Sequence, residues 1–165
     1  MQNIDWNKEI KEALDRTEFM ALSSVNNGES WTNPVAFAYS ETMELFFISM
    51  MDAKHSQNIL ANPNVSVAIF KTERFPSGDV IGLQLKGQAK HLTEISEIQK
   101  AAKYYFGRSP GNEEFRQKTS ESGGSGALWQ FFKITPTELW CFDSRIFGEE
   151  RKKVDLSTLV LDFRN

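Results

Sequence analysis

The stretch SMMDAKHSQNI, residues 49–59, carries the strongest structural signal in the chain. It follows an apolar run that predicts a strand over Glu44–Ser49. It then leads into a short predicted helix over Lys54–Ala61, which Pro63 prevents from continuing. The pattern therefore predicts a strand, a four-residue loop and a helix start in close succession.

The side chains at this junction have an equally distinct chemistry. Ser49 brings a hydroxyl to the end of the strand, and Lys54 and His55 occupy the first turn of the helix. Free N–H groups and the helix dipole favour an anion at such a place, and Lys54 adds a point charge. Two interpretations stay open: a phosphate-binding site, or an ordinary solvated helix start with Asp52 as its N-cap.

Upstream of this junction, the pattern predicts a helix and a hairpin. Apolar residues at helical spacing predict an amphipathic helix over Asp5–Arg16, with Asp5 as N-cap. Strands are predicted over Phe19–Val25 and Ser30–Tyr39, joined by a tight turn rich in Asn and Gly. Pro34 lies inside the second strand, so this strand is expected at a sheet edge or to be bulged there.

Downstream, alternation predicts further strands and one longer helix. A long strand over Val80–Leu92 contains Gly82 and Gly87, which are expected to be bend or bulge points. The remaining predicted segments are a strand over Val65–Ile69, a loop over Phe75–Asp79, a helix over Glu94–Phe106, a break over Gly107–Asn112 followed by a short polar helix, a flexible loop over Ser122–Gly126, and strands over Ala127–Ile134 and Glu138–Phe142 around a turn at Thr135 and Pro136.

The 165 residues fit one domain, with an N-terminal helical part over 1–18 and a C-terminal tail over 144–165. The fold expected is mainly β with helical insertions (α+β), with about six to seven antiparallel strands closing into a small barrel. The 13 Phe and 4 Trp are enough large rings for a β-rich core or a flat ligand pocket.

Charge and composition exclude several classes of protein. The net charge of −3 gives no basic face for nucleic acid. No apolar run is long enough for a membrane span and no signal pattern opens the chain, so a cytoplasmic protein is expected. Cys141 is the only cysteine and the chain has only two histidines, so no metal site is expected. Dinucleotide, P-loop and nucleophile-elbow motifs are absent from the sequence.

The order and spacing of several segments resemble the pyridoxamine 5′-phosphate oxidase-like FMN-binding split-barrel family. The resemblance covers roughly residues 19–148. It rests on the hairpin over 19–39, the strand-loop-helix over 45–59 with its sequel LANPNV at 60–65, GLQLKGQA at 82–89, and the closing segments LWQF at 128–131, ITPTEL at 134–139 and FGEER at 147–151.

This resemblance implies a split β-barrel that binds FMN. Ser49 matches the hydroxyl residue that holds the flavin phosphate in the family. Lys54 and His55 match two adjacent basic residues that also hold it, although the family's Arg-Lys pair has become Lys-His. Gln84 corresponds more loosely to a cofactor-contacting Gln on the long strand. The ring would lie beside the second strand, lined through backbone groups of Asn33, Pro34, Val35 and Phe37.

The resemblance also implies a homodimer with cofactor sites at the interface. The partner subunit would place a ring on the flavin, and Trp129 is the candidate, with burial in a strand as the alternative. Trp140 is expected in the core or at the interface. Trp31 is expected either on the cofactor face or on the hairpin surface.

The function implied is a flavin-dependent oxidoreductase of unknown substrate, with NAD(P)H or another small molecule as electron donor. The substrate-holding Arg-x-His pair of the oxidase proper is missing near the C-terminus, so oxidation of vitamin B6 is not expected. The catalytic residues are unknown, and Tyr39 and His55 are weak candidates for a proton donor. The alternatives are a non-catalytic stress-related or sensor flavoprotein, a barrel that binds haem or a deazaflavin, and a structural dimer with an empty pocket.

Overall fold

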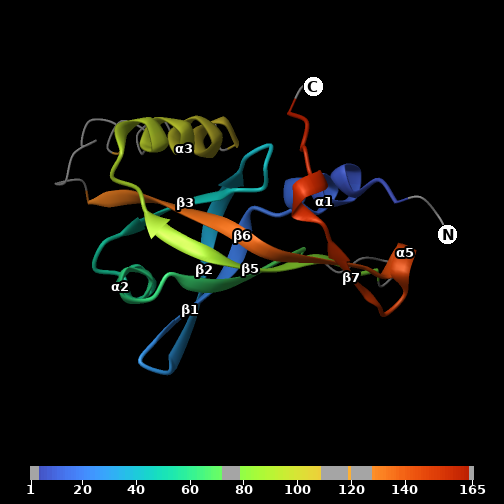
Figure 1. The fold of residues 1–165 in the computed structure, drawn as a ribbon, viewed down its shortest axis with the longest axis horizontal. Helices are drawn as coiled ribbons and strands as arrows, with labels where there is room; N and C mark the ends of the chain where they lie inside the picture. Colours follow the sequence, from blue (N-terminus) through green and yellow to red (C-terminus); the bar gives the residue numbers. More distant parts are fainter. Residues whose placement is uncertain (1–3, 72–78, 109–118, 120–127, 164–165) are drawn as a thin grey trace.

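The computed structural model describes residues 4–71, 79–108, 119 and 128–163. These residues form a single seven-stranded antiparallel sheet with helices around it (Figure 1). The strands are β1 (Phe19–Asn26), β2 (Glu29–Tyr39), β3 (Leu45–Met50), β4 (Asn64–Phe70), β5 (Ile81–His91), β6 (Trp129–Asp143) and β7 (Arg151–Val154). The helices are α1 (Trp6–Asp15), α2 (Lys54–Ala61), α3 (Ile95–Arg108), α5 (Ser144–Phe147) and the 3₁₀ turn η1 (Leu156–Thr158).

The sheet closes on itself, which confirms the split-barrel prediction. The strand order is β3-β2-β1-β4-β5-β6-β7, and β3 also pairs with β6. Leu45 lies opposite Ile134 at one end of this closing ladder and Met50 lies opposite Trp129 at the other. Six strands therefore form the ring, and β7 pairs with Leu139–Phe142 of β6, on the edge that β3 leaves free beyond Ile134.

β6 corrects the prediction of two strands separated by a turn at Thr135 and Pro136. The structure has one continuous strand over these residues. Pro136 lies opposite Gly87, where the β5–β6 register shifts, and a proline is tolerated at such an irregular position because its missing N–H costs no regular ladder bond. The proline therefore marks a bulge and not a strand end.

Gly87 is the predicted bulge, and the structure confirms it. The register shifts between Lys86 and Gly87. A Cβ atom at Gly87 would lie 2.6 Å from the carbonyl oxygen of Thr135, closer than real side chains allow. No bulge lies at Gly82, because that residue pairs with Phe70 and Phe142 in regular register, and a bend there stays a prediction.

The split in the barrel lies between β2 and β3. These strands pair only over Phe37–Tyr39 and Leu45–Phe47. Residues 29–36 of β2 pair with β1 alone among the described strands, so the other edge of this segment has no strand neighbour. Pro34 lies in this half, as the edge-strand prediction required, and the register with β1 continues past it without a bulge.

The β1–β2 hairpin extends beyond the rest of the barrel (Figure 1). Asn27 and Gly28 form its turn with φ values of 49° and 81°. Positive φ at both residues is what a two-residue hairpin turn needs, so the predicted turn is confirmed.

Two hydrophobic clusters hold the fold. The barrel interior contains the stacked rings of Phe47 and Phe132, whose centroids are 5.1 Å apart, and Ile10 and Leu14 of α1 close it at one end. The second cluster joins α3 to the outer face of β3 and β6 through Phe46, Ile48, Ala101, Phe106 and Phe131. Figure 1 shows α3 lying across these two strands.

The C-terminal tail runs beside α1 (Figure 1), where the backbone N–H of Val160 donates to Oδ1 of Asn7 at 2.9 Å. Asp5 caps α1 by accepting a hydrogen bond from the backbone N–H of Lys8, as predicted. Leu159 and Leu161 of the tail are buried in the barrel cluster. The tail therefore covers one end of the barrel.

Some predicted segments lie outside the described residues. They are most of the loop over 75–79, the short polar helix after residue 112 and the loop over 122–126. The helix predicted over Glu94–Phe106 is α3, which runs two residues further to Arg108.

Candidate functional site

The end of β3 and the start of α2 form the junction that the sequence singled out. α2 begins at Lys54, as predicted, but its N-cap is Ala53 and not Asp52, and no side chain caps it. The first N–H groups of a helix have no intrahelical acceptor. The first turn of α2 therefore retains donors for an external anion.

The Ser49 hydroxyl lies at the centre of a buried polar group. Its Oγ is 2.7 Å from Nε2 of His55, and the Ser56 hydroxyl donates to it at 3.0 Å. Ser49 and Ser56 are buried, and burial lowers the pKa of His55. His55 is consequently neutral at neutral pH, with one ring nitrogen as donor and the other as acceptor.

Lys54 does not join this group. Its ammonium lies 3.7 Å from Oε2 of Glu29 on the β1–β2 hairpin, and both side chains are largely exposed. An exposed ion pair contributes little to stability, so Lys54 can change partner at small cost. The structure thus brings Ser49 and His55 together and leaves Lys54 at the rim.

A second polar contact behind the junction was not predicted. The Asn58 side-chain amide donates to the Ser24 hydroxyl at 3.1 Å, and Ser24 in turn donates to the carbonyl oxygen of Trp31 at 3.4 Å. This link ties α2 to the hairpin across 34 residues. The helical spacing of His55, Asn58 and Ile59 at i, i+3 and i+4 is the sequence signal that places them on one inward face.

The β2 residues of the predicted ring site lie along the free edge. Val35 and Phe37 have their side chains in the barrel core, so only their backbone groups can face a ligand. Pro34 is exposed. Asn33 has a buried Oδ1 atom without a hydrogen-bond partner in the structure, an acceptor that a ligand donor would satisfy.

Gln84 and Trp129 are not part of the Ser49 group. Gln84 is exposed on β5, opposite Ala68 and Trp140. Trp129 is half-buried opposite Met50 and packs against the cluster under α3, not in the barrel interior. A cofactor contact by Trp129 from a second subunit stays a prediction.

Trp31 and Trp140 occupy surface positions. Trp31 is 46% exposed on the hairpin. Trp140 is half-buried, with the Lys153 ammonium 5.7 Å from its ring, and is not in either core cluster. Its expected placement in the core is wrong, and an interface role stays a prediction.

No group of three or more His, Cys, Asp or Glu residues in the described segments is arranged to hold a metal ion. Cys141 is buried as a free thiol. Among the described helices, none has the length and apolar content needed to cross a bilayer.

The sequence matches the model of the pyridoxamine 5′-phosphate oxidase family over residues 6–140. The chain belongs to the pyridoxamine 5′-phosphate oxidase family. The match spans α1 and the first five barrel strands and ends within β6, before β7 and the tail. No curated protein sequence matches the chain.

Solved structures with the same fold carry diverse descriptions. A heme binding protein from Mycobacterium smegmatis superposes with a TM-score of 0.71 at 14% identity over 95% of this chain and 60% of that protein. HutZ, the heme storage protein from Vibrio cholerae, gives 0.61 at 19% identity over 80% and 91% of the two chains. A candidate pyridoxamine 5′-phosphate oxidase from Listeria innocua gives 0.61 at 16% identity over 84% and 98%. At sequence identities of 14–19%, the likeness to these structures establishes the fold of this chain alone.

The buried His55 predicts a pH dependence of stability. Because burial lowers its pKa below the usual 6.5, the unfolded chain binds a proton at this residue at higher pH than the folded chain does. The free energy of unfolding should therefore fall as the pH drops below about 6.5. Urea unfolding of the wild type and His55→Gln across this range measures the effect, and the variant should show a shallower loss.

His91→Gln is the control, since His91 is the other histidine of the chain and also has a side-chain hydrogen-bond partner, the amide of Gln130. In His91→Gln, the free energy of unfolding should still fall at low pH as steeply as in the wild type, whereas in His55→Gln it should not. Equal pH slopes for the wild type and His55→Gln would contradict the assignment.

Proposed function

We propose that the chain is an FMN-binding flavoprotein and that its phosphate site is the junction of β3 and α2. The observation that carries the proposal is the Ser49 hydroxyl held against His55 at the uncapped start of α2, beside the free edge of β2. Family membership supports it, since by resemblance Ser49, Lys54 and His55 match the residues that hold the phosphate in the family.

The donor set fits a phosphate. Hydroxyl, imidazole, ammonium and helix N–H groups are all donors, and the helix dipole adds to their attraction for an anion. Lys54 would exchange Glu29 for the phosphate. The family's Arg-Lys pair is replaced by Lys54 and a neutral His55, so the site carries one less positive charge than the family pattern.

The free edge of β2 fits the flavin ring. Backbone N–H and C=O groups along residues 29–36 lack a strand partner on one side and can bond the polar edge of a planar ring. The unpartnered Oδ1 of Asn33 supplies one acceptor there. FMN, when bound, would supply the redox chemistry, while these groups bind and orient it.

The activity we propose is that of an oxidoreductase with an unidentified substrate, reduced by NAD(P)H or another small donor. Oxidation of pyridoxamine phosphate is not proposed. The oxidase's Arg-x-His pair is missing, and Arg145 is bonded to Asp143 and Glu12. A homodimer would bring Trp129 of the partner subunit to the flavin.

Haem is the second candidate, favoured by the fold shared with the Mycobacterium smegmatis and Vibrio cholerae proteins. Both histidines of the chain are already hydrogen-bonded, His55 to Ser49 and His91 to Gln130. A histidine ligand to the iron from this chain would require one of these bonds to break, which is why FMN is preferred.

The absorbance spectrum of freshly purified protein, with the mass of the ligand released on denaturation, tests the proposal. Flavin bands and the mass of FMN are expected. A haem spectrum, or the mass of a deazaflavin, would overturn it. Oxidation of NAD(P)H with turnover on an acceptor would then separate an oxidoreductase from a non-catalytic flavin sensor.

Lys54→Ala should weaken FMN binding about tenfold. Charge-assisted hydrogen bonds contribute about 1.5–3 kcal/mol, and the low end applies because the Lys54 side chain is 54% exposed. Titration of apoprotein with FMN, followed by quenching of flavin fluorescence, measures the change.

Lys8→Ala is the matched control, because Lys8 is an exposed lysine on α1, and α1 is not part of the junction of β3 and α2. Its dissociation constant should equal that of the wild type. If Lys54→Ala also binds FMN with unchanged affinity, Lys54 does not contact the phosphate.

A further inference from the structure

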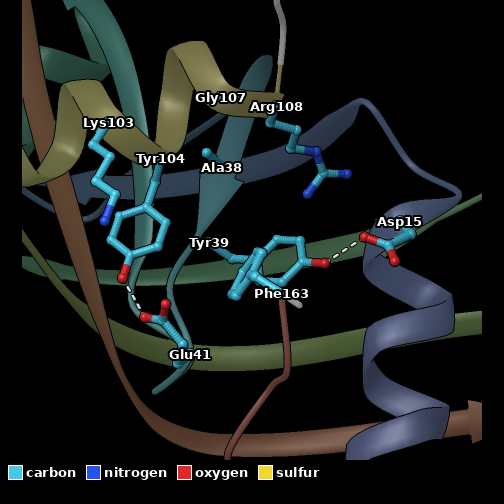
Figure 2. Close-up of a pocket in the computed structure, with 9 residues that line it drawn as sticks. All are labelled: Asp15, Ala38, Tyr39, Glu41, Lys103, Tyr104, Gly107, Arg108 and Phe163. Atoms are coloured by element: carbon cyan, nitrogen blue, oxygen red, sulfur yellow. Dashed lines mark hydrogen bonds between the residues drawn. The ribbon is translucent and has the colours of Figure 1, made fainter. Parts of the chain in front are cut away.

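A second pocket lies away from the Ser49 junction, at the end of the barrel where β2 turns into β3. It has a volume of about 410 Å³ and is enclosed by the end of α1, the end of β2, the C-terminal turn of α3 and the tail (Figure 2). Tyr39 lines it, and Tyr39 pairs with Leu45 at the opposite end of β3 from Met50. The pocket is therefore separate from the proposed flavin site, and its size is typical of a small-molecule site.

Aromatic rings form much of the wall. Phe163 of the tail lies with its ring centroid 5.1 Å from that of Tyr39 and 5.9 Å from that of Tyr104. The tail is held beside the pocket by a hydrogen bond from the backbone N–H of Leu161 to the carbonyl oxygen of Glu41. These rings offer flat apolar surface to a planar ligand.

The two carboxylates of the pocket are already engaged. Asp15 accepts hydrogen bonds from Tyr39 and Lys11, and Glu41 accepts one from Tyr104. Figure 2 shows the two tyrosine hydroxyls turned towards these carboxylates. Neither acid therefore needs a ligand to satisfy it.

Arg108 is different, because part of its guanidinium has no partner. One terminal nitrogen donates to the carbonyl oxygens of Leu14 and Thr17, while the other, Nη1, is buried and has no acceptor in the structure. The guanidinium lies over the rings of Phe37 and Tyr39, at 4.6 and 5.0 Å from their centroids. A buried donor without an acceptor is uncommon in native proteins and is often satisfied by a ligand or water.

We propose that this pocket binds a small aromatic carboxylate, with its ring against the wall that Tyr39, Tyr104 and Phe163 form and its carboxylate accepting from Arg108. A carboxylate suits a guanidinium because charged N–H···O bonds are about twice as strong as neutral ones. Lys103 adds a second positive charge on the pocket wall. Asp15 and Glu18 balance the charge of Arg108 through space, so selectivity rests on the directed N–H donors.

Three probes that differ only in their polar group test the proposal: phenylacetate, phenylacetamide and phenethylamine. Isothermal titration of the whole chain should show phenylacetate binding about tenfold or more tightly than the other two. Equal or tighter binding of the amide or the amine would overturn the carboxylate assignment. Absence of phenylacetate binding at millimolar concentration would overturn the site.

Two variants locate the bound probe. Arg108→Lys retains the charge but loses the fork of donors, and should remove most of the preference for phenylacetate over phenylacetamide. Phe163→Ala removes a ring that is 43% exposed at the tail, which leaves the core intact, and should weaken phenylacetate by about tenfold. Phe70→Ala, on an exposed phenylalanine of β4, should leave binding unchanged. Unchanged binding in both Arg108→Lys and Phe163→Ala would overturn the proposal.

Discussion

Riboflavin will bind about a thousandfold more weakly than FMN, a difference of about 4 kcal/mol. The two ligands differ only in the phosphate, and the phosphate is the group that the junction of β3 and α2 would hold. Removing it leaves the Ser49 hydroxyl, Lys54 and the first N–H groups of α2 without their anionic acceptor. Each charge-assisted bond contributes about 1.5–3 kcal/mol, and two such bonds account for the effect.

Calorimetric titration of apoprotein with each ligand measures this difference, and Ser49→Ala sharpens it. Ser49→Ala should bind FMN about tenfold more weakly than the wild type and should bind riboflavin with almost unchanged affinity. Ser96→Ala, an exposed serine of α3, serves as control and should alter neither affinity. Comparable dissociation constants for FMN and riboflavin in the wild type would mean that the phosphate is not the anchor.

Gly87→Val should destabilise the fold by about 3 kcal/mol or more, a large part of the total stability of a domain of this size.

 The physical reason is steric. The first side-chain atom at this position would lie 2.6 Å from the backbone carbonyl oxygen of Thr135 and 3.0 Å from a methyl group of Ile134. A backbone oxygen in a paired strand cannot move aside as a flexible side chain can, so the β5–β6 ladder itself must shift. The midpoint of urea unfolding measures the loss.

Gly107→Ala is the matched control for this substitution. A Cβ atom at Gly107 meets nothing within 4 Å, and the residue lies in α3. Alanine is favoured over glycine in helices by about 1 kcal/mol, so this variant should be as stable as the wild type or slightly more so. A Gly87→Val protein with wild-type stability would show that the bulge is not as tightly packed as the structure indicates.

Most of the fold was predictable because its signals are local. The bounds of α2 follow from Pro63 and from the apolar run before Ser49, and the hairpin turn follows from Asn27 and Gly28. β6 was not predictable in the same way. Pro136 normally ends a strand, and its tolerance depends on Gly87, a residue on another strand whose register cannot be read from the segment itself.

In the candidate site too, contacts within one segment were predictable and contacts between distant segments were not. Ser49 and His55 are six residues apart, and the strand-loop-helix pattern was enough to predict that they meet. The contact of Asn58 with Ser24 and the carbonyl bonds of Arg108 to the end of α1 join distant segments. No periodicity in one segment encodes such contacts, so the second pocket could not be predicted from the sequence.

The ladder between β3 and β6 has a consequence for how the chain is made. Leu45 must find Ile134, with β4, β5 and α3 lying between them in sequence. Contacts of high sequence separation slow folding, because the entropy of loop closure is lost before the pairing is gained. During synthesis the ring cannot close until β6 has left the ribosome, and until then β3 and the free edge of β2 are open to other chains. We therefore expect co-translational chaperone contact to end only after that point.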